Sequence, residues 1–447
     1  MTDSAKPQLM DRPKTEAKHA ASEASGAALL AALDGTRSAA TSVHDAALDR
    51  LPVPHRRVER WKYTPVAAWW KDVLSTEVHT VAAAGCEANP VPGLDAYRLV
   101  FVNGTFDAAA SDLPVHAGVV CMPLSQKGDA AVQPVDAFSP ETTDWFAGVN
   151  GKYGQEGLYL RVAKGVTLDR PILVHHHTSG SGVFSALRHD IALEAQAEVT
   201  LVHWSSAAAS ADGSVNILTR ADVADGARLH LDKVQDEEGQ VRHIAFEDIR
   251  QGRDSHAEVH TVTVRGQWVR NDLAFRINGP GAHAELNGAF LPGEGEFVDN
   301  HTTVDHRVPH CTSSENYKGI LYGKSTGVFN GKVFVRPDAQ QTNAYQQNAN
   351  ILASDKASIN AKPELEIYAD DVKCSHGCTV GQFDSDALFY ARSRGVGLEA
   401  AKAMLVHAFI GDVLKGIKLE EVRLEVEHRL AEKHGWEVWS DHPNHDA

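Results

Sequence analysis

The chain has 447 residues, of which 43% are hydrophobic and 23% are charged, and its formal net charge is −16. This length exceeds what one compact core usually serves, so we expect two or three domains or an elongated fold. The acidic balance argues against nucleic acid as the main partner, and no apolar run approaches the ~18 residues of a membrane helix. We therefore expect a cytoplasmic protein that binds neither nucleic acid nor a membrane.

Cysteine and histidine usage points toward thiol or metal chemistry. The chain contains five cysteines and 24 histidines. An odd cysteine count in a long chain with a polar N-terminus is typical of reduced thiols rather than a disulfide framework. The histidine excess favours a metal hypothesis, with scattered surface histidines as the alternative.

The N-terminal part changes character near residue 26. Residues 1–25 are rich in Ala, Ser, Lys and Glu and have few large apolar groups, so we expect them to be disordered. Residues 26–96 show apolar positions at three- and four-residue steps with a break at 34–36, which predicts two short helices. The aromatic rings of Trp61 and of the tryptophan pair at Trp69 are interpreted as anchors that hold these helices on the main body.

Residues 97–381 consist of short apolar and β-branched runs broken by Gly, Asp and Asn, which indicates strands. Four segments open with a small residue and continue with polar and apolar residues in alternation; they start at Ala197, Ala227, Ala257 and Ala282. Repetition every 25 to 30 residues is typical of a solenoid, because each repeat buries its apolar face only by stacking on its neighbours. We predict a mainly β chain built on a parallel β-helix, with a β-sandwich as the alternative.

Two histidine-rich stretches lie within this strand region. Neighbouring residues of a strand face opposite ways, so of His175, His176 and His177 only the first and third could act together on a metal. The second stretch contains five candidate ligands within eleven residues: His301, Asp305, His306, His310 and Cys311. Such density suits zinc or iron, but the spacing matches no zinc finger, and polar ladders in solenoid bends explain it equally well.

Residues 370–381 place two cysteines and a histidine at alternate positions. On an extended strand Cys374, His376 and Cys378 share one face. At ~3.3 Å per residue the two cysteine Cα atoms lie ~13 Å apart, too far for a disulfide or for all three side chains to share one ion without a bend. Lys373 would favour the thiolate of Cys374 if it stays close. The segment predicts half of a metal site, which ligands from elsewhere in the fold or from another chain complete.

Residues 382–447 return to a helical period. Asp384 is placed to cap a helix that ends near Arg394. The next helix, about Leu398 to Leu414, is apolar on most sides. Its excess apolar surface either packs between neighbouring elements or serves as a docking face for a partner.

Several segments together resemble the SufB/SufD family of iron–sulfur cluster assembly proteins. The segments that carry the resemblance are 59–64, 303–320, 328–333, 340–350, 362–377 and 388–395. The Cys-Ser-His-Gly sequence that starts at Cys374 is most similar to the D-type member of the family, since the B-type member usually has Cys-Glu-His.

The resemblance implies a right-handed parallel β-helix flanked by N- and C-terminal helical regions, acting as a scaffold rather than an enzyme. It implies pairing with a SufB-like chain through the β-helix and docking of a SufC-like ABC-type ATPase on the C-terminal helices. The chain itself has no phosphate-binding loop. An iron–sulfur cluster, or iron and sulfide, would be held transiently at the shared interface. Delivery of reduced flavin through the complex and a homodimer of the isolated chain stay open.

Carried over to this sequence, the resemblance makes Cys374 and His376 ligands at that interface. Cys378 departs from the family's usual Ala and is either an added ligand or a small buried thiol. The residues expected to dock the ATPase are Phe389, Arg394, Met404, Phe409, Ile410 and Leu414. Two other functions stay open: a self-sufficient β-helix metalloenzyme that uses the ligands between His301 and Cys311, and a purely structural interaction module.

Overall fold

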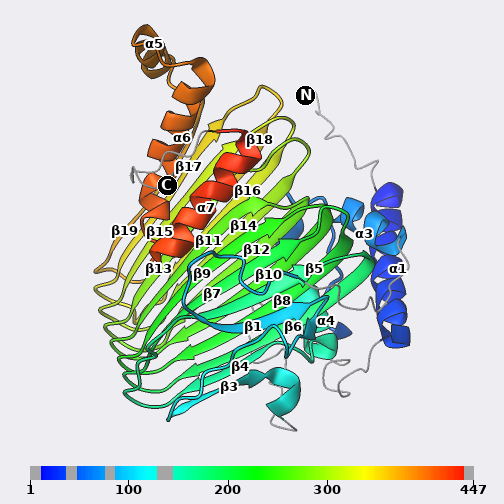
Figure 1. Cartoon of the computed structure of the whole chain (residues 1–447), viewed down its shortest axis with the longest axis vertical. Coiled ribbons are helices and arrows are strands. Elements are labelled where there is room, and N and C mark those ends of the chain that lie inside the picture. The colour runs from blue at the N-terminus through cyan, green and yellow to red at the C-terminus, as the bar shows by residue number, and fades with distance from the viewer. Residues whose placement is uncertain (1–11, 37–47, 76–85, 128–143, 437–447) are drawn as a thin grey trace, which may run out of the picture.

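The computed structural model describes residues 12–36, 48–75, 86–127 and 144–436. Within these ranges the strands form two sheets that run the length of the molecule (Figure 1). Sheet A has ten strands in the order β19-β17-β15-β13-β11-β9-β7-β5-β1-β2, and sheet B has nine in the order β18-β16-β14-β12-β10-β8-β6-β4-β3. Successive strands from β4 onward alternate between the sheets and pair in parallel with the strand two places along the chain. This is a parallel β-solenoid, so the predicted fold class is confirmed and the β-sandwich alternative is wrong.

The strand bounds are as follows: β1 Tyr97–Val102, β2 Thr105–Phe106, β3 Val119–Pro123, β4 Leu158–Val162, β5 Ile172–Thr178, β6 Ser181–Leu193, β7 Glu198–Ala207, β8 Asp212–Val223, β9 Arg228–Glu237, β10 Gln240–Gln251, β11 His256–Arg265, β12 Trp268–Ile277, β13 His283–Phe290, β14 Phe297–His306, β15 Thr312–Leu321, β16 Thr326–Val335, β17 Asn343–Leu352, β18 Ser358–Ile367 and β19 Lys373–Gly381. The helices flank this solenoid at both ends of the chain.

The predicted repeat is correct in kind but shifted in two of its steps. β7 pairs with β9 through Glu198 and Arg228, which matches the predicted step from Ala197 to Ala227. The later pairings, Arg228 with His256 and Ala257 with Ala284, differ by two residues from the predicted starts. A shift of two residues keeps every side chain on its face of the strand, so the apolar pattern survives the wrong register.

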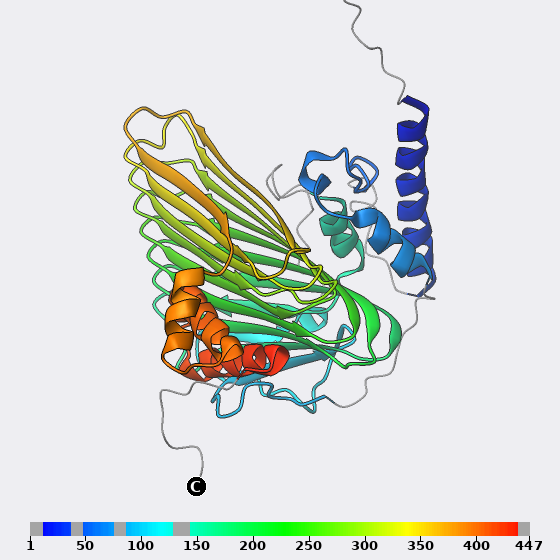
Figure 2. The same cartoon turned by 90° about the horizontal axis from the view of Figure 1, so that it is seen from above.

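The N-terminal helices cover the outer face of sheet B (Figures 1 and 2). They are α1 (Arg12–Thr36), α3 (Val66–Ser75) and α4 (Trp145–Tyr153). The predicted anchoring rings are buried against this face, which confirms that interpretation. Residues 12–25, predicted to be disordered, are instead helical, because Ala, Glu and Lys are good helix formers and the helix continues into the buried Leu29 and Leu33. Most of the second predicted helix lies outside the described residues.

Buried ion pairs fix the aromatic and basic segment 59–64 to sheet B. The guanidinium of Arg270 donates to Asp272 at 2.8 Å, to Asp299 at 2.9 Å and to the carbonyl of Arg60 at 2.9 Å. Arg60 itself donates to Asp272 at 2.6 Å, and Thr64 Oγ1 donates to Asp299 at 2.6 Å. Detaching the segment would remove partners of buried charged groups and leave their charges uncompensated, which costs free energy. The network therefore holds the segment on the solenoid.

The C-terminal helices are α5 (Ser385–Ser393), α6 (Leu398–Leu414) and α7 (Glu420–His434). α6 and α7 pack on the outer face of sheet A, where Val406 and Val426 join Trp204 and Val262 in one buried cluster. They lie on the opposite side of the solenoid from α1 (Figure 2), and α5 projects beyond its C-terminal end (Figure 1). Within the described ranges, none of the helices combines the length and apolar character that a membrane crossing requires.

A candidate metal and partner site at the open end of the solenoid

The C-terminal end of the solenoid is formed by two edge strands. Among the described residues β18 pairs only with β16, and β19 pairs only with β17. No residue of either strand is buried. Edge strands present unpaired N–H and C=O groups that can pair with another chain. We call this region, made of β18 and β19, the open end.

The three predicted ligands lie on β19 at the open end. Cys374 pairs with Ala344, His376 with Gln346, and Cys378 with Asn348. The three partner side chains on β17 are buried inside the solenoid. Paired residues of parallel strands lie on the same face of the sheet, so the predicted ligands continue these rows of inward-facing side chains by one coil. Cys374 is half-buried and packs against the central core, whereas His376 and Cys378 are exposed. The structure therefore places the three on one face of an edge strand.

Among the residues that the structure describes, the open-end ligands form an incomplete set. Cys378 Sγ has the side-chain oxygen of Asn348 at 3.8 Å as a hydrogen-bond acceptor. In the described part of the chain, groups of three or more convergent His, Cys, Asp or Glu ligands do not include Cys374, His376 or Cys378. A tetrahedral metal site needs four donors, and the residues that the structure describes do not supply the remaining ones at this end.

Burial, rather than a neighbouring charge, sets the acidity of these thiols. Burial raises the pKa of Cys374 above its usual range, although a hydrogen bond to the Ala344 backbone partly offsets this, and burial also raises the pKa of Cys378. Lys373, expected to favour the thiolate if it stays close, does not contribute to the pKa shift of Cys374, since neighbouring side chains of a strand face opposite ways. These shifts favour the protonated thiols in the isolated chain, and binding of a metal or a cationic partner would favour the thiolates.

The first histidine stretch resolves into two faces, as predicted. His175 Nε2 lies 2.8 Å and His177 Nδ1 lies 2.9 Å from the hydroxyl of Ser206, which both rings share. His176 turns to the other side and contacts His189 at 3.1 Å. A serine hydroxyl thus occupies the position between the two rings that a shared ion would need.

The second stretch is dispersed rather than assembled into a site. His301 faces outward and pairs with Asp299 at 2.9 Å, while His306 faces inward and lies 2.9 Å from the hydroxyl of Ser313. Burial lowers the pKa of His306 to about 4. Cys311 is buried, with Sγ directed at backbone carbonyls, and His310 is exposed in a left-handed turn with φ of 62°. The hypothesis that these residues form one metal site is wrong, because strand alternation and the turn separate them.

The predicted docking residues divide between two faces of the C-terminal helices. Phe389 is 75% exposed on α5 and Met404 is 41% exposed on α6, and Arg394 is exposed just after α5. By contrast, Ile410 and Leu414 are buried against sheet A. The prediction that these two residues face a partner is wrong, because the side of α6 that carries them is already used to cover the chain's own sheet.

Phe409 takes an intermediate place on α6. It is partly buried at the edge of the cluster on sheet A, and its backbone carbonyl accepts a hydrogen bond from Lys318 Nζ at 2.7 Å. The first reading left open for α6 therefore holds for one side of the helix, which packs on the solenoid, whereas the other side leaves apolar groups exposed.

The sequence reading missed a row of histidine and acidic residues on the outer face of sheet A. Its members share alternate positions of neighbouring strands: His230 and Asp232 on β9; His256, Glu258 and His260 on β11; His283 and Glu285 on β13. The available signal was the recurrence of His-x-Asp or His-x-Glu at the start of consecutive repeats. We call these seven residues the histidine ladder.

Comparison with known proteins assigns most of the chain to two matched regions. The model described as the SufBD protein N-terminal region matches residues 21–174, and the model described as the SufBD core domain of SUF system FeS cluster assembly matches residues 176–409. The iron–sulfur cluster assembly protein SufD of Escherichia coli is 30% identical over 90% of this chain and 94% of its own length. An iron–sulfur cluster assembly SufBD family protein of Synechocystis is 28% identical over 84% of this chain and 86% of its own.

Proposed function

The chain belongs to the SufBD family of iron–sulfur cluster assembly proteins, and from this we propose that it is a SufD-like scaffold subunit of a cytoplasmic SufBCD-type complex. In this role the chain holds part of a nascent cluster and carries no turnover of its own. The cluster, or its iron and sulfide, is the cargo rather than a resident cofactor.

The observation that carries the proposal is the inward-facing row of thiol and imidazole groups on β19, an edge strand that pairs on one side only among the described residues. Iron of a cluster prefers thiolate and imidazole nitrogen. Cys374 and His376 offer one of each, Cys378 offers a second thiol, and all three lie where the solenoid ends. A second chain that pairs with the open end would bring the missing ligands next to them.

A SufB-like chain is the partner that fits the open end. The apolar side chains of Ile367 at the end of β18, of Tyr368 directly after it and of Val380 on β19 are exposed. Such groups are buried when strands or coils of a second solenoid cover them, and the backbone groups of β18 and β19 supply hydrogen bonds to the incoming chain. A second copy of this chain is the competing occupant, and the mass of the purified complex distinguishes the two.

The projecting helices supply a docking platform for the SufC-like ATPase. Phe389 and Met404 give exposed apolar anchors, and Arg394 lies over the ring of Tyr390 at 5.2 Å and adds a cation. Aromatic and arginine side chains are common anchors of protein interfaces. In the assembled complex the ATPase hydrolyses ATP, and a reduced flavin can deliver electrons to the cluster.

The ligand assignment is tested by changing Cys374→Ala together with His376→Ala in the co-expressed complex. We expect unchanged folding and unchanged recovery of partners, because both changes are at exposed or half-buried positions of an edge strand. Bound iron and sulfide should fall strongly, because the variant lacks a thiol ligand and an imidazole ligand. Ser375→Ala is the matched control, since it lies on the other face of the same strand. Normal cluster content in the double variant would instead support a purely structural role for this chain.

The docking assignment is tested by Phe389→Ala with Met404→Ala. Loss of two exposed apolar anchors should weaken capture of the ATPase by about tenfold or more while the solenoid still pairs. Val115→Ala, at a position that is 99% exposed in a loop, is the control for loss of an exposed apolar side chain. Undiminished ATPase capture by the double variant would reject this platform.

A further inference from the structure

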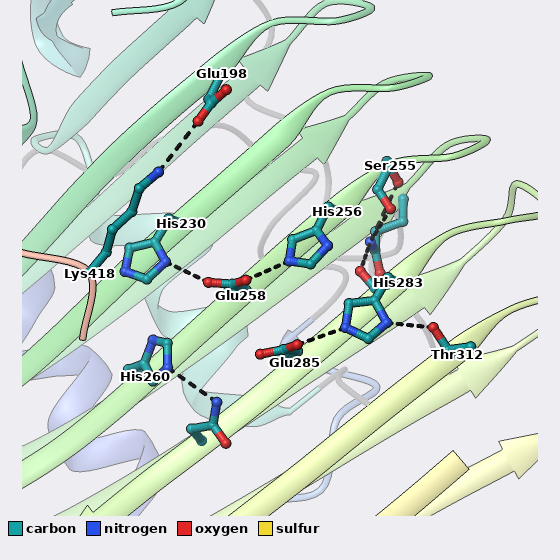
Figure 3. Close-up of polar contacts among 12 residues, drawn as sticks. Glu198, His230, Ser255, His256, Glu258, His260, His283, Glu285, Thr312 and Lys418 are labelled. Atoms are coloured by element: carbon teal, nitrogen blue, oxygen red, sulfur yellow. Dashed lines mark hydrogen bonds and ion pairs between the residues drawn. The ribbon is translucent and has the colours of Figure 1, made fainter. Parts of the chain in front are cut away.

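The histidine ladder lies on the outer face of sheet A beside the turn that joins α6 to α7. Figure 3 shows His230, Glu258 and His256 in line across neighbouring strands, with His260 below them and Lys418 of the turn reaching toward Glu198. The ladder is remote from the cysteines of the open end, since β11 is separated from β19 by β13, β15 and β17. It is therefore a separate cluster of possible ligands.

Three ladder residues converge at the spacing that a metal ion requires. His230 Nε2 lies 3.0 Å and His260 Nδ1 lies 3.3 Å from the same carboxylate oxygen of Asp232. All three ligand atoms lie within 4.8 Å of one another, and all three residues are buried. Bonds of about 2.0–2.2 Å in a tetrahedral zinc site place neighbouring ligand atoms about 3.3–3.5 Å apart, so little movement is needed.

A carboxylate behind His230 sets the ring in the orientation that a ligand needs. Glu258 Oε2 accepts from His230 Nδ1 at 2.8 Å, which leaves Nε2 directed at Asp232 and His260. An acidic group on the far nitrogen of a metal-binding histidine fixes its tautomer and raises its basicity. The amide nitrogen of Asn287 lies 3.1 Å from His260 Nε2. A half-turn of this amide, which exchanges its nitrogen and oxygen, presents the oxygen to a protonated Nε2 and leaves His260 Nδ1 free to bind.

One oxygen of this group lacks a hydrogen-bond partner although it is buried. It is Asp232 Oδ2, on a side chain that is 1% exposed, whereas His260 Nδ1 has the contact to Asp232 Oδ1 described above. A buried polar atom without a partner costs about 1–3 kcal/mol. Asp232 Oδ2 belongs to the convergent three residues, so it is a second sign that a ligand belongs here.

We propose that His230, Asp232 and His260 bind one divalent transition-metal ion, zinc or ferrous iron, beneath the α6–α7 turn. Imidazole nitrogen and carboxylate oxygen are ligands that both ions accept.

The position of the site gives it a structural consequence. A Cβ atom at Gly416, in the α6–α7 turn, would lie 2.4 Å from His260 Nε2, so the turn packs directly on this ring. An ion that fixes His260 also fixes the surface that the turn covers. Metal binding is therefore expected to stabilise the packing of the C-terminal helices on sheet A.

The other half of the ladder is a weaker candidate and provides the comparison. His256, His283 and Glu285 also converge, but each is partly exposed. Their polar atoms are already paired: His256 with Glu258 at 2.5 Å, and His283 with Glu285 at 2.8 Å and with Thr312. Because these polar atoms already have partners, an ion would satisfy fewer unpaired groups here.

The test is a cobalt titration of the full chain carrying Cys374→Ala, His376→Ala and Cys378→Ala, so that the open end contributes no ligand. Co²⁺ should bind with one ion per chain, give the visible bands of tetrahedral cobalt without a thiolate charge-transfer band, and be displaced by Zn²⁺. Asp232→Asn, which conserves volume, should abolish the spectrum. Glu258→Gln should weaken binding by about 10–100-fold, because it acts only through His230.

His256→Ala with His283→Ala is the matched control and should leave the cobalt spectrum intact. The assignment would be overturned if this control lost the cobalt spectrum while Asp232→Asn kept it. It would also be overturned if the parent chain did not bind Co²⁺ or Zn²⁺ stoichiometrically. The parent should also unfold at a higher temperature with Zn²⁺ than without it, and Asp232→Asn should lose that increment. These readouts do not depend on cluster assembly, so failure here leaves the proposed function untouched.

Discussion

The two ends of the solenoid solve the problem of an exposed sheet edge in opposite ways. At the N-terminal end, β2 pairs antiparallel with β1 and β3 pairs antiparallel with β4, so a short strand closes each sheet. Phe101 of β1 is fully buried there and packs on Phe106 of β2 with ring centroids 5.7 Å apart. At the open end, β18 and β19 carry no such cover in the described part of the chain.

The difference separates stability from function. Short edge strands are a common way to prevent edge-to-edge association, and the closed end uses them. The open end keeps two long edges and puts its apolar and thiol groups on them. Residues of the closed end should therefore contribute to folding of the isolated chain, whereas residues of the open end should contribute to assembly.

The largest effect is expected from Phe101→Ala at the closed end. Removing a fully buried aromatic side chain should lower the free energy of unfolding by about 3–5 kcal/mol, because it leaves a cavity in a packed core. Chemical denaturation of the isolated chain measures this. A loss below about 1 kcal/mol would contradict the view that the closed end is a folding element.

A smaller and pH-dependent effect is expected from Glu315→Gln, two strands inward from the open end. Burial raises the pKa of Glu315 to about 7, against opposing hydrogen bonds from Thr302 and Gln346. The folded state thus favours the neutral acid, so this group stabilises the protein fully below about pH 4.5 and loses that contribution as the pH rises to about 7.

Glu315→Gln should remove this dependence and exceed the wild-type stability by about 1–3 kcal/mol at pH 8, with little difference at pH 4.5. Denaturation of both proteins at the two pH values gives the comparison, since other titrating groups cancel in the difference. An equal gap at both pH values would show that Glu315 does not titrate in this range.

The smallest effect on the isolated chain is expected from Val380→Asp at the open end. Val380 is 50% exposed, so the change should alter the free energy of unfolding by about 0.5 kcal/mol or less. In the complex the same change buries a charge at the proposed interface and should weaken pairing by tenfold or more. Native mass spectrometry of the co-expressed chains measures the pairing, and unchanged pairing would count against an interface at this end.

The sequence by itself determined the features that depend on local period. Segments of period-two alternation that repeat every 25 to 30 residues predicted the solenoid, although two repeat steps were two residues wrong, and the same period placed Cys374, His376 and Cys378 on one face. Asp384 caps α5 by accepting from Asp386 N at 2.9 Å, and Gly435 ends α7 in a left-handed turn, both as their residue types predict. Such features need only neighbours in the chain.

Only the tertiary structure decided which faces meet. It dispersed the ligands between His301 and Cys311, although they are close in sequence, and it joined His230 to His260 from adjacent coils. It also buried Ile410 and Leu414 of α6 against sheet A. The physical reason is that periodicity fixes the side of a strand or helix on which a residue lies, whereas the partner on that side is set by register and packing over long sequence distances.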